Sequence, residues 1–314
     1  MPACLVTGGA GFIGSNLVAE LLRQNWRVRV LDNFSTGKRS HLDRVLAAAQ
    51  ANTFELVEGD IRNRDDCLNA CREVEYVFHQ AALRSVPRSV DDPSATNEVN
   101  VLGTLNVLQA AVKAGVRRFV YASSSSVYGD TSISPQQEDH RPGPISPYAV
   151  SKLAGEHYGV SFCQVYGLET VSLRYFNVFG PHQDPESKYS ALIPSFIQQV
   201  SRGEPLEVHG DGLQSRDFTY VGDVVQANLL AAQAAKVAGQ VFNIACGRSH
   251  TVLDVGETIV RIMGRDPGRH HTEARRGDVR HTRADISRAQ RSLGYQPGTN
   301  LEDGLRRAVE YFSL

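Results

Sequence analysis

The chain has 314 residues, 41% of them hydrophobic and 21% charged, with a formal net charge of -1 and a sequence pI near 6.8. Such a length can bury a large core and fits one large domain or two coupled ones. The near-neutral charge offers no basic field for nucleic acid or an anionic membrane surface, and no apolar run approaches membrane-spanning length.

The N-terminus enters a strand directly, without a charged leader or a cleavable apolar segment, so we expect a cytoplasmic protein. Residues 4–6 form an apolar run that predicts a buried strand, and residues 15–24 carry apolar side chains at helical spacing. Between them lies a turn with Gly8, Gly11 and Gly14. This order is typical of a dinucleotide-binding unit: Gly8 permits the tight turn, Gly11 lets a pyrophosphate approach, and Gly14 lets the helix lie close to the sheet.

A second strand, residues 27–31, ends in Asp32, which lies about 20 residues past the glycine turn, where a Rossmann acid hydrogen-bonds the adenosine ribose. Its carboxylate would repel a 2′-phosphate, which favours NAD over NADP. Lys38 and Arg39 follow closely, and their positive charges would instead favour the 2′-phosphate of NADP.

The next elements alternate between helix and strand. We expect helices at 42–50, 65–71 and 97–114, and strands at 54–57, 74–78 and 118–122. Asp60 follows one strand end and can reach the adenine amine or cap the next helix. Ser123 to Ser126 follow another strand end, at the sheet edge where ligands bind. The pattern predicts an α/β fold with a doubly wound parallel Rossmann sheet.

A further helix begins near Pro147, with Ser146 as its N-cap, and residues 171–175 form a sixth strand. Beyond Gly180 the regular alternation stops. There we expect a helix at 193–202, strands at 206–209 and 241–244, and a final helix at 301–312. We therefore predict an NAD-binding domain of residues 1–175 and a smaller C-terminal substrate-binding lobe of residues 176–314, with some elements returning to the first domain.

Ser124, Tyr148 and Lys152 form the predicted catalytic set. Tyr148 and Lys152 lie four residues apart on one helix face. A phenol has a pKa of about 10, and a nearby ammonium lowers it, so Tyr148 can take a hydroxyl proton while carbon gives hydride to NAD. Ser124 can bind the same substrate oxygen. The alternative is an ordinary surface Tyr and Lys.

The five cysteines are Cys4, Cys67, Cys71, Cys163 and Cys246. Cys67 and Cys71 are spaced by one helical turn, but no second pair or histidine cluster completes a zinc set. We expect structural thiols and no metal site.

The later motifs identify a family resemblance. The glycine turn, residues 123–129 and Tyr148-x-x-x-Lys152 resemble the extended short-chain dehydrogenase/reductases. Residues 173–180, 216–221 and 275–278, together with residues 79–83 and 183–185, are similar to those of the nucleotide-sugar 4-epimerases that act on UDP-glucose and UDP-N-acetylglucosamine. The resemblance covers nearly the whole chain. It implies an NAD-dependent UDP-hexose 4-epimerase, an isomerase that oxidises C4 transiently to a ketone.

By motif, the resemblance implies a set of NAD-binding residues: Gly8, Gly11, Phe12, Ile13, Gly14, Asp32, Asn33, Asp60, Ile61, Gln80, Ala82, Asn100, Tyr148, Lys152 and Tyr175. It also implies a set of UDP-sugar-binding residues: Arg84, Ser124, Ser125, Tyr148, Asn177, Ala191, Ile193, Val208, Arg216, Arg275, Asp278 and Thr282. Arg216 and Arg275 are natural clamps for a diphosphate.

Sister activities differ at the serine run. Family 4,6-dehydratases carry an Asp-Glu pair where this chain has Ser125 and Ser126, and glucuronate decarboxylases carry a Glu at Ser126, so both are disfavoured. Glucuronate 4-epimerases share the serine run and remain an alternative. Asn177-Val178-Phe179-Gly180 favours neutral sugars, whereas Arg84 could narrow the pocket or attract a carboxylate.

The resemblance also bears on size selection and assembly. Relatives restricted to glucose and galactose carry a Tyr at the position of Thr282, so this smaller side chain predicts room for N-acetyl sugars. Relatives are usually homodimers that pack through two helices per subunit, here residues 97–114 and 148–165. A non-catalytic, NAD-sensing or RNA-binding member of the fold is the remaining alternative, although such proteins often lose the Tyr or the Lys.

Overall fold

The computed structural model describes residues 1–46, 53–184, 192–273 and 280–313. At its centre is a seven-stranded sheet in the order β3-β2-β1-β4-β5-β6-β11, and every neighbouring pair is parallel. This confirms the predicted doubly wound Rossmann sheet. The strands are β1 (Ala3–Thr7), β2 (Arg27–Asp32), β3 (Phe54–Glu58), β4 (Tyr76–His79), β5 (Arg118–Ser124), β6 (Glu169–Tyr175) and β11 (Gln240–Ile244).

Both faces of the sheet are buried, because side chains that alternate along a strand enter two different cores. In β1, for example, Cys4 and Val6 belong to one core and Leu5 to the other. The first core is covered by α1 (Phe12–Arg23), α2 (Arg39–Leu46), α9 (Val221–Gln233) and α11 (Ser287–Leu293). The second is covered by α3 (Arg64–Ala70), α6 (Thr104–Ala114) and α7 (Pro147–Tyr166).

The single helix predicted at 97–114 is interrupted in the structure. Two short helices, α4 (Val86–Asp91) and α5 (Pro93–Asn97), precede a π-helical stretch, η1 (Glu98–Gly103), and only then does α6 begin. A Cβ on Gly103 would lie 2.6 Å from Ile61 Cδ1, so this turn packs closely against the loop after β3. The wider π turn also directs Asn100 towards the loop after β4.

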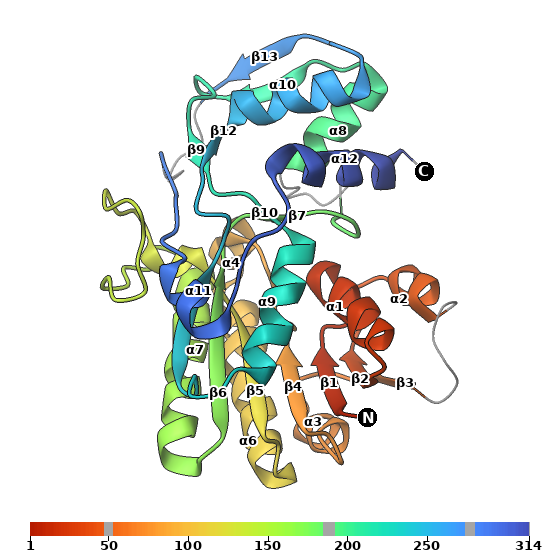
Figure 1. The fold of residues 1–314 in the computed structure, drawn as a ribbon, viewed down its shortest axis with the longest axis vertical. Helices are drawn as coiled ribbons and strands as arrows, with labels where there is room; N and C mark the ends of the chain where they lie inside the picture. Colours follow the sequence, from red (N-terminus) through yellow and green to blue (C-terminus); the bar gives the residue numbers. More distant parts are fainter. Residues whose placement is uncertain (47–52, 185–191, 274–279, 314) are drawn as a thin grey trace.

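A smaller lobe lies beyond the carboxyl ends of the strands (Figure 1). Its core combines α8 (Leu192–Arg202), α10 (Val252–Met263) and α12 (Leu301–Phe312) with β8 (Leu206–His209), which pairs in parallel with β13 (Arg269–Thr272). Short pairs, β7 (Val178–Phe179) with β10 (Thr219–Tyr220) and β9 (Ser215–Arg216) with β12 (His250–Thr251), connect it to the sheet. Phe12 and Ile13 of α1 pack against this core.

The chain crosses between the sheet and the smaller lobe more than once. After β10 it returns as α9, which packs against α1 and the sheet, and β11 then extends the sheet next to β6. The helices α9 and α10 were not predicted from the sequence. Within the described part of the chain, no helix is both long enough and apolar enough to cross a membrane.

Candidate active site

The glycine turn between β1 and α1 is tightly built. Gly8 has φ +69°, and its amide donates to Leu31 O at 2.8 Å. A Cβ on Gly8 would lie 2.7 Å from the main chain of Ala81, and one on Gly14 only 2.1 Å from Gly8 O. A Cβ on Gly11 would lie 3.2 Å from the same oxygen. The spacing of the three glycines is thus imposed by backbone packing.

The N-terminus of α1 fits a diphosphate. Gly11, its N-cap, has no side chain to accept from the first N–H groups, so these donors can serve a bound anion. The side chains of Phe12 and Ile13 pack against apolar cores, so their part in binding would come from the main chain. The turn is therefore a suitable cradle for the pyrophosphate of NAD.

Asp32 lies at the carboxyl end of β2 and shapes the same turn. Its carboxylate accepts from the amides of Ala10 and Phe34, each at 2.8 Å. Burial raises the pKa of Asp32, and these two hydrogen bonds partly offset that effect. The two basic residues whose charge would favour NADP are both paired with carboxylates: Lys38 pairs with Asp184 at 3.2 Å, and Arg39 pairs with Glu58.

The loop after β3 brings three predicted residues together. Asn33 Nδ2 donates to Asp60 Oδ2 at 2.8 Å. Asp60 also accepts from Arg62, and this pairing, which outweighs the effect of burial, lowers the pKa of Asp60 to about 2. Ile61 is buried against η1. Asp60 is thus an ionised acceptor beside Asn33, where the adenosine end is expected.

A buried polar cluster lies under the loop after β4. Gln80 Nε2 donates to Asn228 Oδ1 at 3.0 Å and to Tyr175 Oη at 3.1 Å, and Asn228 Nδ2 donates to Tyr175 Oη at 2.9 Å. Burial raises the pKa of Tyr175 to about 12, so its hydroxyl stays protonated at neutral pH. Asn228 was missed in the sequence analysis, because α9 was not predicted and the two partners of Asn228 come from other elements. Ala82, two residues past Gln80, is half-buried on the same loop.

The predicted catalytic residues meet at the carboxyl edge of the sheet. Ser124 ends β5, while Tyr148 and Lys152 come from the first turns of α7, whose N-cap is Ser146. The side chain of Ser124 lies near the hydroxyl of Tyr148 and acts to lower its pKa. Lys152 Nζ donates to Ala122 O at 2.8 Å and lies 5.9 Å from the centre of the Tyr148 ring. Ser124 Oγ also accepts from Ser126 Oγ at 2.9 Å.

The electrostatics of this group differ from the expectation in one respect. Burial raises the pKa of Tyr148, and the side chain of Ser124 and the charge of Arg84 partly offset it. We expected the favourable charge to come from Lys152, but in the structure the exposed guanidinium of Arg84 contributes it. Burial lowers the pKa of Lys152 itself to about 8, against the opposing effect of Glu156.

The predicted sugar-binding residues are brought together only in part. Asn177 Nδ2 donates to Asp217 O at 3.3 Å and approaches Thr282 Oγ1 at 3.5 Å. Arg216 donates to the main chain of Ser215 and Arg280, and so lies beside the segment that carries Thr282. Ser125 begins the 3-10 turn η2 (Ser125–Tyr128) and is half-buried. Ala191, Arg275 and Asp278 lie outside the described residues.

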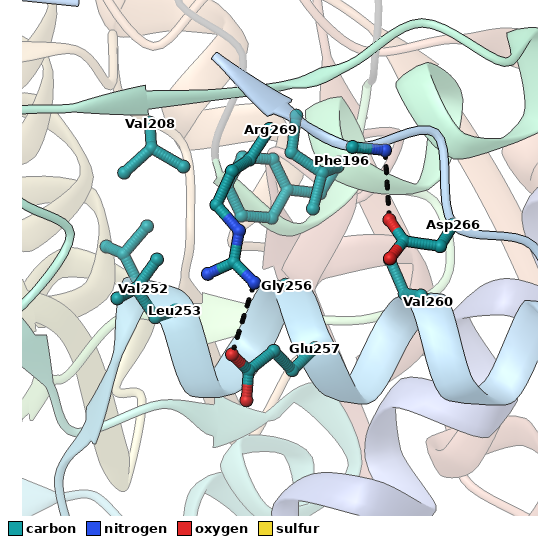
Figure 2. A pocket seen from close by; sticks show the side chains of 11 residues that line it. Phe196, Val208, Val252, Leu253, Gly256, Glu257, Val260, Asp266 and Arg269 are labelled. Atoms are coloured by element: carbon teal, nitrogen blue, oxygen red, sulfur yellow. Dashed lines mark hydrogen bonds and ion pairs between the residues drawn. The ribbon is translucent and has the colours of Figure 1, made fainter. Parts of the chain in front are cut away.

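Ile193 and Val208 are each only 2% exposed and belong to the core of the smaller lobe. Their side chains point into that core, so they would contact a nucleotide through their main chain. Figure 2 shows a small pocket lined by Val208, Phe196 and Gly256, with Arg269 and Glu257 paired at 3.5 Å beside it. It lies between α8, β8 and α10, away from Tyr148.

No group of three or more His, Cys, Asp or Glu side chains is placed to hold a metal ion in the described ranges. The five cysteines are free thiols, and three of them, Cys4, Cys67 and Cys71, are buried. Burial raises the pKa of Cys67 and of Cys71 to about 12, so these thiols are protonated at neutral pH.

Comparison with known proteins gives consistent matches over the whole chain. The family model described as "NAD dependent epimerase/dehydratase family" matches residues 4–245. A UDP-glucose 4-epimerase of Mycolicibacterium smegmatis is 39% identical over 310 residues, covering 98% of this chain and 97% of that protein. A relative from Methanocaldococcus jannaschii is 38% identical over 309 residues, with the same two coverages.

Three solved structures are similar in fold and in sequence. The UDP-glucose 4-epimerase of Thermotoga maritima with UDP-glucose has a TM-score of 0.93 at 38% identity, covering 99% of this chain and 98% of that one. The UDP-N-acetylglucosamine 4-epimerase of Methanobrevibacter ruminantium with UDP-N-acetylmuramic acid has 0.94 at 37%, with the same coverages. The UDP-glucuronic acid 4-epimerase of Bacillus cereus with UDP-glucuronic acid and NAD has 0.91 at 32%, covering 99% of each chain.

Proposed function

This chain belongs to the NAD dependent epimerase/dehydratase family, and from that premise we propose that it is a UDP-hexose 4-epimerase, an isomerase that uses tightly bound NAD. The observation that carries the proposal is the meeting of Ser124, Tyr148 and Lys152 at the same edge of the sheet as the glycine turn. These side chains lie at the carboxyl edge of a parallel sheet, where such folds bind their ligands.

The reaction needs one base that later acts as an acid. Tyr148 takes the proton from the 4-hydroxyl of the sugar and returns it after the keto sugar has rotated in the site. Ser124 hydrogen-bonds the same oxygen. This contact fixes C4 so that hydride leaves from one face. NAD, when bound, would supply the hydride acceptor for C4, and because the hydride would return to the sugar there would be no net oxidation. The 4-keto sugar is the intermediate.

We assign the cofactor to the surface formed by the glycine turn, Asp32, the loop after β3 and the loop after β4. Gly11 and the first N–H groups of α1 would hold the pyrophosphate, and Asp32 the adenosine ribose. The engagement of Lys38 by Asp184 and of Arg39 by Glu58 supports NAD over NADP. Lys152 would hold the nicotinamide ribose.

The substrate range follows from the wall near Asn177. The half-buried Thr282 next to Asn177 leaves more room than a Tyr at this position would, and this supports N-acetylhexosamines as substrates beside the plain hexoses. A second candidate is a UDP-glucuronate 4-epimerase. Arg84 favours it, because an exposed guanidinium close enough to act on Tyr148 could pair with a sugar carboxylate.

Purified protein should be incubated with UDP-glucose, UDP-galactose, their N-acetyl forms and UDP-glucuronate, without added NAD, and the products separated by chromatography. We expect interconversion of the 4-epimers of the hexoses and N-acetylhexosamines. Conversion of the uronate alone would establish the second candidate. Failure to convert any of them would favour a non-catalytic member of the family. The intact set of Ser124, Tyr148 and Lys152 argues against that alternative.

We also propose a cytoplasmic homodimer that binds neither nucleic acid nor membrane. The net charge of -1 supports the absence of polyanionic partners. Large apolar side chains are exposed on the two helical segments expected to pair: Leu102 of η1 at 41%, and Val150, Val165 and Tyr166 of α7 at 53%, 68% and 58%. Burying them against a second copy would remove this apolar surface from water. Comparing the sedimentation of the wild type with that of Val150→Asp tests whether this apolar surface holds a dimer together.

A further inference from the structure

A buried ion pair lies next to the proposed catalytic residues, and the proposed function does not use it. Glu156 of α7 and Arg174 of β6 each expose only 4% of their side chains. Arg174 Nη2 donates to Glu156 Oε2 at 2.8 Å, and Arg174 Nε donates to Glu156 Oε1 at 2.9 Å. Such a two-bond pair is rigid, and burying it requires that both charges remain matched.

The carboxylate also holds the strand end that carries Ser124. Ser123 Oγ donates to Glu156 Oε1 in a short hydrogen bond. On one side of Ser123 is Ala122, whose carbonyl accepts from Lys152 Nζ at 2.8 Å, and on the other is Ser124. Glu156 therefore fixes the stretch of main chain, residues 122–124, that binds Lys152 and carries Ser124.

Glu156 lies one helical turn beyond Lys152, on the same face of α7. Lys152 is 4% exposed, so its ammonium has been moved out of water. Burial lowers the pKa of Lys152 to about 8, and the negative charge of Glu156 opposes this. Without that charge the pKa of Lys152 would be lower still.

Other titratable groups also surround Lys152. From β5, the ring of Tyr121 lies 5.2 Å from Nζ, and burial raises its pKa well above the ordinary value. From β4, burial and then the charge of Lys152 lower the pKa of His79 to about 3. On α7, Tyr148 is the proposed base, and Arg84 acts on it from the loop after β4. Tyr121 and His79 are thus neutral at pH 7.

The remaining charge is that of Arg174, which faces Glu156 from β6. Burial alone would lower the pKa of Arg174, but its hydrogen bonds with Glu156 and the charge of that carboxylate raise it above the ordinary value. Arg174 therefore stays cationic and partly neutralises the field that Lys152 experiences. The charge state of Lys152 depends on the balance between this carboxylate and this guanidinium.

We propose that Glu156 is a positioning residue, whose carboxylate, held by Arg174, keeps Lys152 in its ammonium form and fixes the strand end that carries Ser124. The roles of Lys152 and Ser124 rest on the proposed function. The charge of Lys152 does not, because it can be measured without any substrate.

The chain has only five lysines, Lys38, Lys113, Lys152, Lys188 and Lys236. Protein labelled with 13C at the lysine ε-carbon therefore gives five signals, and the signal missing in Lys152→Arg is that of Lys152. We expect it to titrate at about 8 in the wild type and at a lower pH in Glu156→Gln. In Arg174→Gln it should titrate above the wild-type value, because the carboxylate is then unopposed.

Opposite shifts in these two variants would show that both charges of the pair act on Lys152. Ser123→Ala, which removes the hydroxyl and keeps both charges, should leave the Lys152 titration unchanged. In epimerase assays the basic limb of the kcat/KM profile should move to lower pH in Glu156→Gln and return in Glu156→Asp. Melting temperatures identify any variant that has not folded.

Unchanged titration of Lys152 in both folded charge variants would overturn the proposal. If Glu156→Gln does not fold, the direction of the shift in Arg174→Gln decides: a rise supports the proposal, and no change overturns it. A wild type without epimerase activity would overturn the proposed function instead, while the Lys152 titration would still decide the role of Glu156.

Discussion

Asn100 binds the main chain of Leu83 with both ends of its amide: Oδ1 accepts from Leu83 N at 2.8 Å, and Nδ2 donates to Leu83 O at 3.0 Å. Asn100 Nδ2 also donates to Ser151 Oγ at 3.0 Å, and Ser151 is the residue before Lys152. The π-helical turn thus ties the loop that carries Gln80 and Arg84 to the helix that carries the proposed base. It makes Asn100 a support for the cofactor loop, in addition to any contact with NAD itself.

This loop places Arg84 where it affects the proposed base. The charge of Arg84 lowers the pKa of Tyr148, against the larger and opposite effect of burial. Because Tyr148 must lose its proton to act as a base, the rate rises with pH through that pKa. Arg84→Met should therefore move the acidic limb of the kcat/KM profile to higher pH. Arg88→Met, a change at an exposed arginine of α4, is the control and should leave the limb in place.

Tyr148→Phe should retain the fold and bound NAD but lower turnover by at least ~100-fold, the usual scale for a lost acid–base group. Turnover close to that of the wild type would refute the assignment of the base. Lys152→Ala should behave differently, since it removes the group assigned to the nicotinamide ribose. We expect it to lose bound nucleotide as well as activity, which chromatography of the extracted cofactor would measure.

Protein purified without added nucleotide should contain NAD or NADH, because hydride leaves and returns within one turnover. Heat-denatured protein would be extracted and its nucleotides separated by chromatography. Recovery of NADP alone would contradict the argument from Asp32. Accumulation of free NADH in proportion to product would show a dehydrogenase and refute the closed cycle.

Gly14 and Gly11 should respond differently to alanine. A Cβ at Gly14 would lie 2.1 Å from Gly8 O, so Gly14→Ala should lose about 1–3 kcal/mol of unfolding free energy or fail to fold. At Gly11 the same atom would lie 3.2 Å from that oxygen, so Gly11→Ala should fold. It should nevertheless retain less NAD, since the methyl group faces the proposed pyrophosphate. Denaturant titration and nucleotide extraction separate the two effects.

Thr282→Tyr should depress the reaction of N-acetylhexosamines and spare the plain hexoses. The larger ring would overlap the room for the acetamido group, and overpacking of a rigid wall costs ~1–3 kcal/mol, or roughly 5- to 150-fold in rate. Thr282→Ala is the matched control and should keep both activities. Equal losses on both substrates in Thr282→Tyr would show that Thr282 does not select size.

The strands of the central sheet could be read from the sequence because each carries either a continuous apolar run, as in β1 and β4, or apolar residues that alternate with polar ones, as in β2. The helix α9 could not be recognised in this way. Its residues Val224, Ala227, Asn228 and Ala231 are all fully buried, since the helix is enclosed by α1 and the sheet. Only Gln226 and Gln233 are exposed polar residues of this helix, so its amphipathic period is weak.

Polar residues of the site were likewise identified only where the sequence itself carries a recognisable motif. Ser124, Tyr148 and Lys152 were found because their spacing belongs to a motif. Asn228 and Glu156 were not, because their partners, Gln80, Tyr175 and Arg174, come from other elements and meet them only in the folded chain. The π turn at Asn100 also escaped detection, since residues 98–103 carry no composition that separates a π turn from an α turn.

Because β11 completes the sheet, the boundary between the lobes is not a place where the protein can be divided. A fragment ending at residue 175 would lack β11 and expose β6, from Val171 to Tyr175, as an open edge with unpaired N–H and C=O groups. It would also lack α9 and α11, leaving uncovered the part of one apolar face on which these helices pack. Exposed edges of this kind recruit other strands, so such a fragment should aggregate when produced alone. Supplied together with residues 176–314 it has a defined partner, which makes the two halves a natural starting point for a split reporter.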